Sequence, residues 1–226
     1  QNGVEVIENI LEEKCKKLNA RFFNFHKRKI PYIILKWAKT NDGFIDINRK
    51  TNQHGINWIT EKETQVLVHK WRAEEDAILV GRKTVLNDDP ELTVREFEGK
   101  QPLRIVIDPE LKLDLNKKIF NENSNTIIVN THVNKVSNNL TYLKLKSENI
   151  ILNLLNYLHE INIMSIIVEG GKETIDYFLK LNYWNEARVI EGNKKFKNGL
   201  ESPKIERKCS AIQNIGKDII YTYYND

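Results

Sequence analysis

The distribution of apolar residues along the chain predicts an alternation of buried strands with amphipathic helices. Runs rich in β-branched and aromatic residues, which favour buried strands, begin at Tyr32 and at Ala77. Apolar residues at helical spacing indicate a long amphipathic helix from Ile150 to Ile161. Such alternation is typical of an α/β fold in which helices flank a largely parallel sheet. Further strands are predicted over 103–107, 126–129, 142–145, 165–168, 187–190 and 219–223, and a further helix through Ile175, Phe178 and Leu179.

Two earlier segments also carry helical signals. Residues 1–29 are predicted to form a helical lead-in, and the basic run 26–29 at its end is expected to be a solvated linker. Thr60 and Glu63 have the spacing of a capping box, which predicts a helix that continues to about Glu75. The periodic apolar residues of the lead-in are Val6, Ile7, Ile10, Leu11, Leu18 and Phe22, and the capped helix is expected to bury Val66, Leu67, the stem of Lys70 and Trp71.

Composition narrows the class of protein. A length of 226 residues fits one large domain, or a domain with a short extension. No apolar run approaches the roughly 18 residues that a membrane-spanning helix needs, so we expect no membrane association. The net charge of +4 is spread along the chain, and this favours a pocket for phosphates over a nucleic-acid-binding surface.

The cysteines and histidines do not form a recognisable metal or disulfide pattern. Cys15 and Cys209 are far apart in sequence, and none of the five histidines lies four residues from another or close to a cysteine. We therefore expect free thiols, no metal site and a reducing, cytoplasmic location.

Three strands are followed by unusually polar segments, at 36–43, 81–95 and 169–174. Ligands of open α/β sheets bind beyond the carboxyl ends of the strands, so these segments are candidates for the site. Gly170 and Gly171 stand between a strand and a helix, where a backbone can approach a phosphate closely. A plain tight turn explains the same pair equally well, and the dinucleotide motif G-x-G-x-x-G is absent.

Single residues in these segments admit both functional and structural interpretations. Lys36 interrupts an apolar strand, so it either serves the site or reaches water from an edge strand. Arg72 near a helix end also suits the helix dipole. Asp88 could belong to a turn, and Arg95 could be a surface residue.

The order and spacing of these segments resemble the reductase domain of the bifunctional riboflavin-biosynthesis deaminase-reductase (the RibD family). The resemblance covers about Pro31 to Leu200, and the run TVLNDDPELTVR is its most specific part. It is carried by Pro31–Gly43, Trp58–Thr60, Arg72–Ala73, Gly81–Arg95, Arg104–Asp108 and Val168–Gly171.

The resemblance implies a dihydrofolate reductase-like fold, with a twisted, mostly parallel sheet and helices on both faces. It implies reduction of 5-amino-6-(5-phosphoribosylamino)uracil to the ribitylamino compound, with NADPH as the hydride donor and C1′ of the ribose as the acceptor. Residues 1–29 resemble the connector that follows a deaminase domain, and 30–226 the reductase domain. A deaminase partner, in cis or in trans, is therefore expected.

The resemblance also assigns roles to residues. Lys36 is the candidate to polarise or protonate the sugar, and Asp88 lies at the junction of cofactor and substrate. Ile56 stands where many relatives have a serine, so a substrate contact there is left to the backbone or lost. Other substrate contacts are implied for Arg72, Leu92, Arg95 and Glu169, and cofactor contacts for Ala38, Trp58, Thr84, Asp88, Gly171, Lys172, Glu173, Thr174, Ile175, Asp176 and Tyr177.

Other interpretations remain open at this stage. One is a dihydrofolate reductase or a reductase of the related diaminopyrimidine, although Arg72 and Arg95, as a phosphate clamp, favour a phosphorylated substrate over a folate. Another is a non-catalytic nucleotide- or phosphosugar-binding module that accompanies a deaminase. The apolar stretch from Ile219 to Tyr224 indicates a homodimer or, equally, a core strand.

Overall fold

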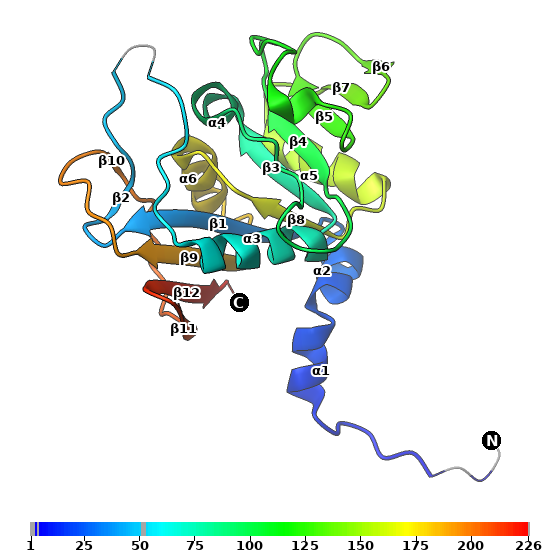
Figure 1. The fold of residues 1–226 in the computed structure, drawn as a ribbon. Helices are drawn as coiled ribbons and strands as arrows, with labels where there is room; N and C mark the ends of the chain where they lie inside the picture. The colour runs from blue at the N-terminus through cyan, green and yellow to red at the C-terminus, as the bar shows by residue number, and fades with distance from the viewer. Residues whose placement is uncertain (1–2, 4, 51–52, 226) are drawn as a thin grey trace.

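The computed structural model describes residues 3, 5–50 and 53–225, and it contains one large twisted sheet with helices on both faces (Figure 1). The strand order is β11-β12-β9-β1-β8-β3-β4-β5-β7-β6. The seven strands from β9 to β7 in this order pair in parallel, and the antiparallel pairs lie at the two sides of the sheet. The expected α/β architecture is therefore confirmed.

The elements have the following bounds. The strands of the large sheet are β1 (Tyr32–Thr40), β3 (Ala77–Gly81), β4 (Leu103–Ile107), β5 (Thr126–Asn130), β6 (Lys135–Ser137), β7 (Leu140–Lys144), β8 (Ser165–Val168), β9 (Glu186–Gly192), β11 (Ala211–Ile215) and β12 (Asp218–Tyr224). A separate two-stranded sheet pairs β2 (Phe44–Asp46) with β10 (Leu200–Glu201). The helices are α1 (Glu12–Leu18), α2 (Ala20–Arg28), α3 (Lys62–Glu74), α4 (Arg82–Asp88), the 3₁₀ turn η1 (Lys118–Phe120), α5 (Ile150–Glu160) and α6 (Lys172–Lys180).

The sheet separates two hydrophobic cores because successive side chains of a strand point to opposite faces. In β1, Ile33 and Leu35 join one core and Ile34 joins the other, and all three are fully buried. Helices α5 and α6 cover the first face, with Leu154 and Phe178 fully buried. Helices α3 and α4 contribute Val68, Trp71 and Val85 to the second core. Two-sided burial explains why the central strands are almost continuously apolar.

The helical lead-in is only partly confirmed. Helix formation begins at Glu12, so Val6, Ile7, Ile10 and Leu11 lie outside any helix and are exposed. The basic run 26–29 is not a linker, because it forms the last turn and the C-cap of α2. Figure 1 shows residues 5–11 extending away from the sheet. An apolar periodicity without a surface to cover does not by itself make a helix.

The capping box predicted from Thr60 and Glu63 is wrong. Helix α3 begins at Lys62 with Glu61 as its N-cap, and no side chain caps it. The Glu61 carboxylate instead accepts a hydrogen bond from the backbone N–H of Lys217, and the Glu61 N–H donates to Asp218. The buried side of α3 is also displaced from the expected one, since Lys70 is exposed and Val66 half-buried, whereas Thr64, Val68, His69 and Trp71 are buried.

A buried charge network fixes α2 against the body of the protein. The Arg21 guanidinium pairs with Glu75, whose side chain is fully buried just beyond α3. Arg188 of β9 lies over the ring of Trp71, with its guanidinium carbon 4.7 Å from the ring centroid, and it pairs with Glu186. These contacts connect α2 to the helix that carries Arg72.

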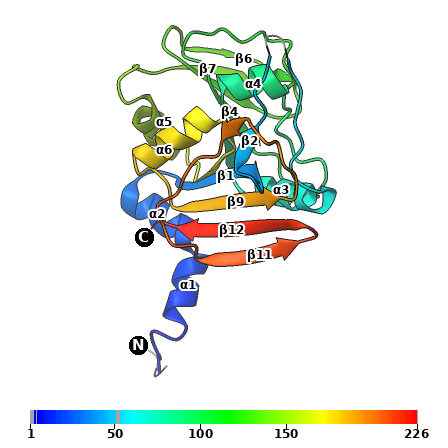
Figure 2. The same ribbon diagram turned by 90° about the vertical axis from the view of Figure 1, so that its left-hand side faces the viewer.

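The C-terminal strands form a hairpin on the β9 side of the sheet (Figure 2). Strand β12 pairs with β9 on one side and β11 on the other, so it is an internal strand of the sheet. Strand β11 is the edge strand, and Ile212 on it is 63% exposed.

Candidate active site

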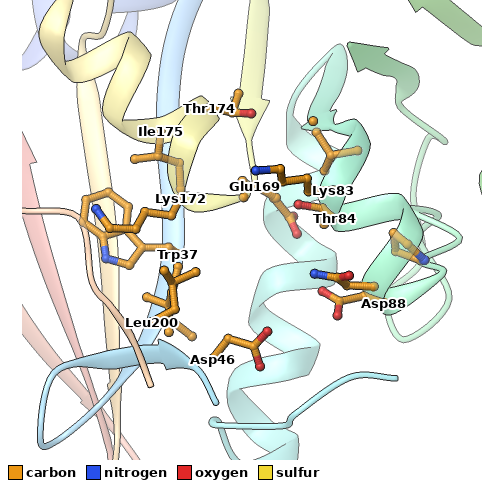
Figure 3. A pocket seen from close by; sticks show the side chains of 18 of the residues that line it. Trp37, Asp46, Lys83, Thr84, Asp88, Glu169, Lys172, Thr174, Ile175 and Leu200 are labelled. Atoms are coloured by element: carbon orange, nitrogen blue, oxygen red, sulfur yellow. The ribbon is translucent and has the colours of Figure 1, made fainter. Parts of the chain in front are cut away.

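The polar segments 36–43, 81–95 and 169–174 meet in one cavity of about 690 Å³, although the first of them lies mostly within β1, which continues to Thr40. These strands are neighbours in the order β1-β8-β3 and run parallel, so their carboxyl ends lie at the same edge of the sheet. Figure 3 shows side chains from α4, from the start of α6 and from the β2–β10 side around this space. A cavity therefore lies where the sequence analysis expected a site, beyond the carboxyl ends of β3 and β8 and beside the second half of β1.

A cluster of one carboxylate and two cations forms the floor of the cavity. Glu169, just after β8, accepts two hydrogen bonds of 2.8 Å from the Arg72 guanidinium. The Lys36 ammonium lies 3.5 Å from the same carboxylate. The three side chains are 7–14% exposed. Lys36 belongs to an internal strand, which excludes the edge-strand interpretation.

Burial and mutual pairing set the charges of this cluster. Burial alone would raise the pKa of Glu169, but Arg72 and Lys36 outweigh it and lower that pKa to about 2. Burial lowers the pKa of Lys36 from its ordinary value, and Arg72 acts in the same direction, while Glu169 opposes both. The Lys36 ammonium is thus a stronger acid than that of an exposed lysine, which suits a proton donor.

Glycines bring the backbones around the cavity close together. A Cβ on Gly81 would lie 2.5 Å from the Thr174 hydroxyl, and a Cβ on Gly171 would lie 3.0 Å from the Thr84 hydroxyl. The Gly81 N–H donates to the carbonyl of Gly170 at 2.8 Å. The Gly170–Gly171 peptide is cis. The first turn of α6 therefore faces the first turn of α4 across a narrow gap that opens into the cavity.

A second charged group lies on the α4 side of the cavity. The Arg49 guanidinium donates to Asp46 at 2.5 Å and to Asp88 at 2.8 Å. Burial raises the pKa of Asp88 to about 6; Arg49 opposes this shift and Asp46 adds to it. Figure 3 shows Asp46 and Asp88 in the same part of the cavity.

Most residues that the sequence singled out lie around this cavity. Two do not line it: Tyr177, further along α6, and Arg95. The Arg95 guanidinium is half-exposed and donates to Glu91 and to the Thr93 hydroxyl. The residues that do line it are Lys36, Ala38, Ile56, Trp58, Arg72, Thr84, Asp88, Leu92, Glu169, Gly171, Lys172, Glu173, Thr174, Ile175 and Asp176.

The sequence reasoning missed several polar residues of the cavity. Asp46, Arg49 and Asn57 come from β2 and the segment that follows it, which has no regular apolar pattern. Arg82 was passed over as part of a polar stretch that is in fact α4, and its guanidinium lies 3.7 Å from the buried carboxylate of Asp108. The signal that could have identified Asp46 and Arg49 is the group of charged residues between the first strand and Trp58.

Among the described residues, no group of three or more His, Cys, Asp or Glu side chains is arranged to hold a metal ion. None of the helices that the structure describes combines the length and the apolar character needed to span a bilayer.

Comparisons with known proteins point to one family. Residues 31–221 match the model of the RibD C-terminal domain. The riboflavin biosynthesis protein RibD of Aquifex aeolicus is 37% identical over 96% of this chain and 64% of its own length. The 2,5-diamino-6-ribosylamino-4(3H)-pyrimidinone 5′-phosphate reductase of Archaeoglobus fulgidus is 31% identical over 85% of this chain and 97% of its own length.

A solved structure gives the same result. The crystal structure of a diaminohydroxyphosphoribosylaminopyrimidine deaminase/5-amino-6-(5-phosphoribosylamino)uracil reductase from Thermotoga maritima superposes with a TM-score of 0.85 at 30% identity, over 97% of this chain and 64% of that protein. The chain thus spans a little under two thirds of these two bifunctional relatives. The dihydrofolate reductase-like fold that we expected is confirmed.

Proposed function

The chain belongs to the RibD C-terminal domain family, and from this premise we propose that it reduces the ribose of 5-amino-6-(5-phosphoribosylamino)uracil to the ribitylamino product, with NADPH as the hydride donor. The observation that carries the proposal is the Lys36–Glu169–Arg72 cluster, which lies in the same cavity as the gap between Thr84 and Gly171. Such a reduction needs a proton donor and room for a cofactor, and the cavity of about 690 Å³ offers a candidate for each.

The residues present fit a nicotinamide dinucleotide. A Cβ on Gly171 would lie 3.0 Å from the Thr84 hydroxyl, so the glycine lets the start of α6 come close to α4 beside the cavity. Helix α6 has nine residues, and its first N–H groups are favourable partners for a phosphate. Trp58 lines the cavity while remaining 51% exposed, which offers an apolar face to a ring. When bound, NADPH supplies the hydride.

Lys36 is proposed to protonate the sugar. As the bond between C1′ and the ring oxygen breaks, the ring oxygen needs a proton, and the Lys36 ammonium stands at the floor of the cavity to donate it. Glu169 keeps the ammonium in place through their 3.5 Å contact. Arg72, bound on the other side of the same carboxylate, fixes the direction in which Glu169 points. The reaction then needs hydride at C1′ and leaves an open-chain ribityl group.

The remaining assigned residues are proposed to hold the substrate and the cofactor. Leu92 and Ile56 supply apolar contact from two walls of the cavity. We propose that Arg95 turns away from Glu91 to bind the substrate phosphate. Its guanidinium is half-exposed, and its 3.2 Å contact with Glu91 is a long one for an ion pair. Ala38, Thr84, Asp88 and the run from Gly171 to Tyr177 are proposed to contact the cofactor.

A second candidate is reduction of the 2,5-diaminopyrimidine counterpart of this substrate. It is favoured by the relative from Archaeoglobus fulgidus, whose whole length this chain nearly covers and whose name specifies that substrate. The two substrates share the phosphoribosylamino group on which Lys36 would act. They differ only on the pyrimidine ring, so the same proton donor serves either one.

The finer assignments follow from the family and are proposals as well. We propose that residues 1–29 form the connector to a deaminase, which acts in cis or in trans, and that 30–226 form the reductase domain. We propose a homodimer and a cytoplasmic location. The location is supported by the two free cysteines, Cys15 and Cys209, since unpaired thiols suit a reducing compartment.

The decisive experiment is an assay that follows NADPH oxidation at 340 nm with each of three acceptors: the aminouracil, the diaminopyrimidinone and dihydrofolate. We expect turnover with a phosphoribosylamino substrate and none with dihydrofolate. Mass spectrometry of the product should show the gain of two hydrogens. Tight NADPH binding without turnover of any acceptor would instead indicate a non-catalytic binding module.

A further inference from the structure

We propose that Arg49 and Asp46 are positioning residues of this site. Arg49 holds Asp88 against the loop that carries Trp58 and stabilises the Asp88 carboxylate, and Asp46 opposes that stabilisation by its own negative charge. This inference rests on the proposed reductase function for its kinetic consequences. Its structural part, the arrangement of three charges, stands independently.

The contacts of Arg49 carry the inference. Its Nε donates to Asp46 at 2.5 Å, its Nη2 to Asp88 at 2.8 Å, and its Nη1 to the carbonyl of Gly55 at 2.9 Å. Only 13% of the side chain is exposed. Every nitrogen of the guanidinium therefore has an acceptor, and the planar group has a single well-defined orientation.

These contacts join two walls of the cavity. Asp88 is the last residue of α4, whereas Gly55 belongs to the segment between β2 and Trp58. Two further bonds follow the same line: the Gly55 N–H donates to the carbonyl of Asn87 at 2.7 Å, and the Asn57 amide donates to Asp46 at 2.7 Å. Removing Arg49 would therefore loosen the loop at the point where it delivers Ile56 and Trp58 to the cavity.

The charges of Arg49 and Asp46 should have opposite effects on the ionisation of Asp88. Among the described residues, Arg49 and Asp46 are the charged groups that act on Asp88. Asp89, its neighbour in sequence, turns its carboxylate to the backbone N–H of Lys118. Arg49 favours the ionised form of Asp88, so substituting Arg49 should raise the pKa of Asp88. Asp46 disfavours that form, so substituting Asp46 should lower the pKa.

Carbon-13 NMR of aspartate carboxyl groups tests this arrangement without any need for turnover, with Asp88→Asn to assign the signal. Arg49→Gln should raise the pKa of Asp88 by about one unit or more, since an opposite charge at this range typically shifts a carboxyl by 1–3 units. Asp46→Asn should lower it. Arg49→Lys keeps the charge but not the fork, so it should preserve most of the pKa while loosening the loop. Lys50→Gln is the matched control, because Lys50 is exposed on the same loop, and it should leave the pKa unchanged.

Kinetics provide the second measurement. In the wild type, kcat/KM should fall below about pH 6, because the proposed contact of Asp88 at the junction of cofactor and substrate needs its ionised carboxylate. This acid limb should move up in Arg49→Gln and down in Asp46→Asn. Shifts in the same direction, or no shift in the NMR titration, would overturn the inference. Opposite NMR shifts in a protein that reduces none of the three acceptors would reject the proposed function and leave the charge arrangement standing.

Discussion

The Lys36 ammonium, in the middle of β1, and the Glu169 carboxylate, just after the end of the adjacent parallel strand β8, lie 3.5 Å apart. The two side chains are only 14% and 7% exposed, so water stabilises their charges less than it would at the surface. The pair is therefore maintained by its own attraction and by Arg72, which supplies the second cation. The first two predictions concern this relationship.

Replacing Lys36 with Ala should lower kcat at saturating substrate and cofactor by roughly 10²–10⁴-fold, which is the usual contribution of a general acid. The physical reason is that no other cation of the floor is free, since Arg72 is bound by Glu169 at both ends of its fork. Steady-state assays would measure the change. Lys39→Ala is the matched control, because Lys39 lies on the same strand, pairs with Glu191 and does not line the cavity. A near-normal kcat for Lys36→Ala would remove Lys36 from the chemistry.

Replacing Glu169 with Gln should destabilise the fold by about 3–5 kcal/mol, because two buried cations would lose their counter-charge. Chemical denaturation near pH 7 would measure the loss. The pKa of Glu169 is lowered to about 2 from its ordinary 4.5. Its stabilising contribution is therefore fully present above pH 4.5 and is lost as the pH falls towards 2.

The pH dependence supplies the control for this second prediction. The difference in unfolding free energy between wild type and Glu169→Gln should shrink across that acid window. A difference that stayed constant from pH 5 to pH 2 would show that the carboxylate charge is not the source of the stability.

Replacing Trp58 with Ala should weaken NADPH binding by about tenfold or more, since a large aromatic contact commonly contributes over 1 kcal/mol to a binding site. The melting temperature should change little, because Trp58 is 51% exposed and belongs to neither core. Titration of cofactor fluorescence gives the dissociation constant. Phe97→Ala is a suitable comparison, as Phe97 is 41% exposed and outside the cavity; equal losses in both variants would contradict a role for Trp58.

Replacing Arg95 with Gln should raise KM for the phosphorylated substrate by about tenfold or more while leaving kcat nearly unchanged, the pattern of a uniform binding contact. The reason is that Arg95 would contact the phosphate, which takes no part in the reduction. The same variant should show no change in KM with the dephosphorylated compound. If KM rose equally for both compounds, the effect would come from the 93–95 backbone, which His69 supports through a 3.0 Å hydrogen bond from the Arg95 N–H.

The parts of the fold that the sequence predicted are those in which local pattern and burial agree. β1, β3 and β8 are internal strands, so their apolar runs could be recognised without knowledge of their neighbours. Helix α4 was missed because its seven residues bury a single side chain, Val85, and therefore show no apolar stripe. The capping box failed because Glu61 binds residues more than 150 positions later, which no local motif reveals.

The candidate site shows the same limit. Residues within or just after a strand, such as Lys36 in β1 and Glu169 and Gly171 after β8, could be located because the strand fixes where they lie. Arg49 could not, because its position depends on long-range contacts with Asp88. Arg95 is a different case: its neighbour Leu92 lines the cavity, whereas the Arg95 side chain pairs with Glu91 outside it, so its proposed role requires a turn of the side chain.

The contacts of Glu61 with Lys217 and Asp218 also have a consequence for synthesis on the ribosome. Every residue that lines the cavity lies at or before Leu200, yet the helix carrying Arg72 is held at its start by residues 217 and 218. A nascent chain that has emerged as far as Leu200 contains every residue of the cavity. It still lacks residues 217 and 218 and strand β12, which pairs with β9. Assembly of the pocket must therefore wait until translation has passed the hairpin, so a ribosome-stalled chain ending near Leu200 would be expected to bind dinucleotide poorly.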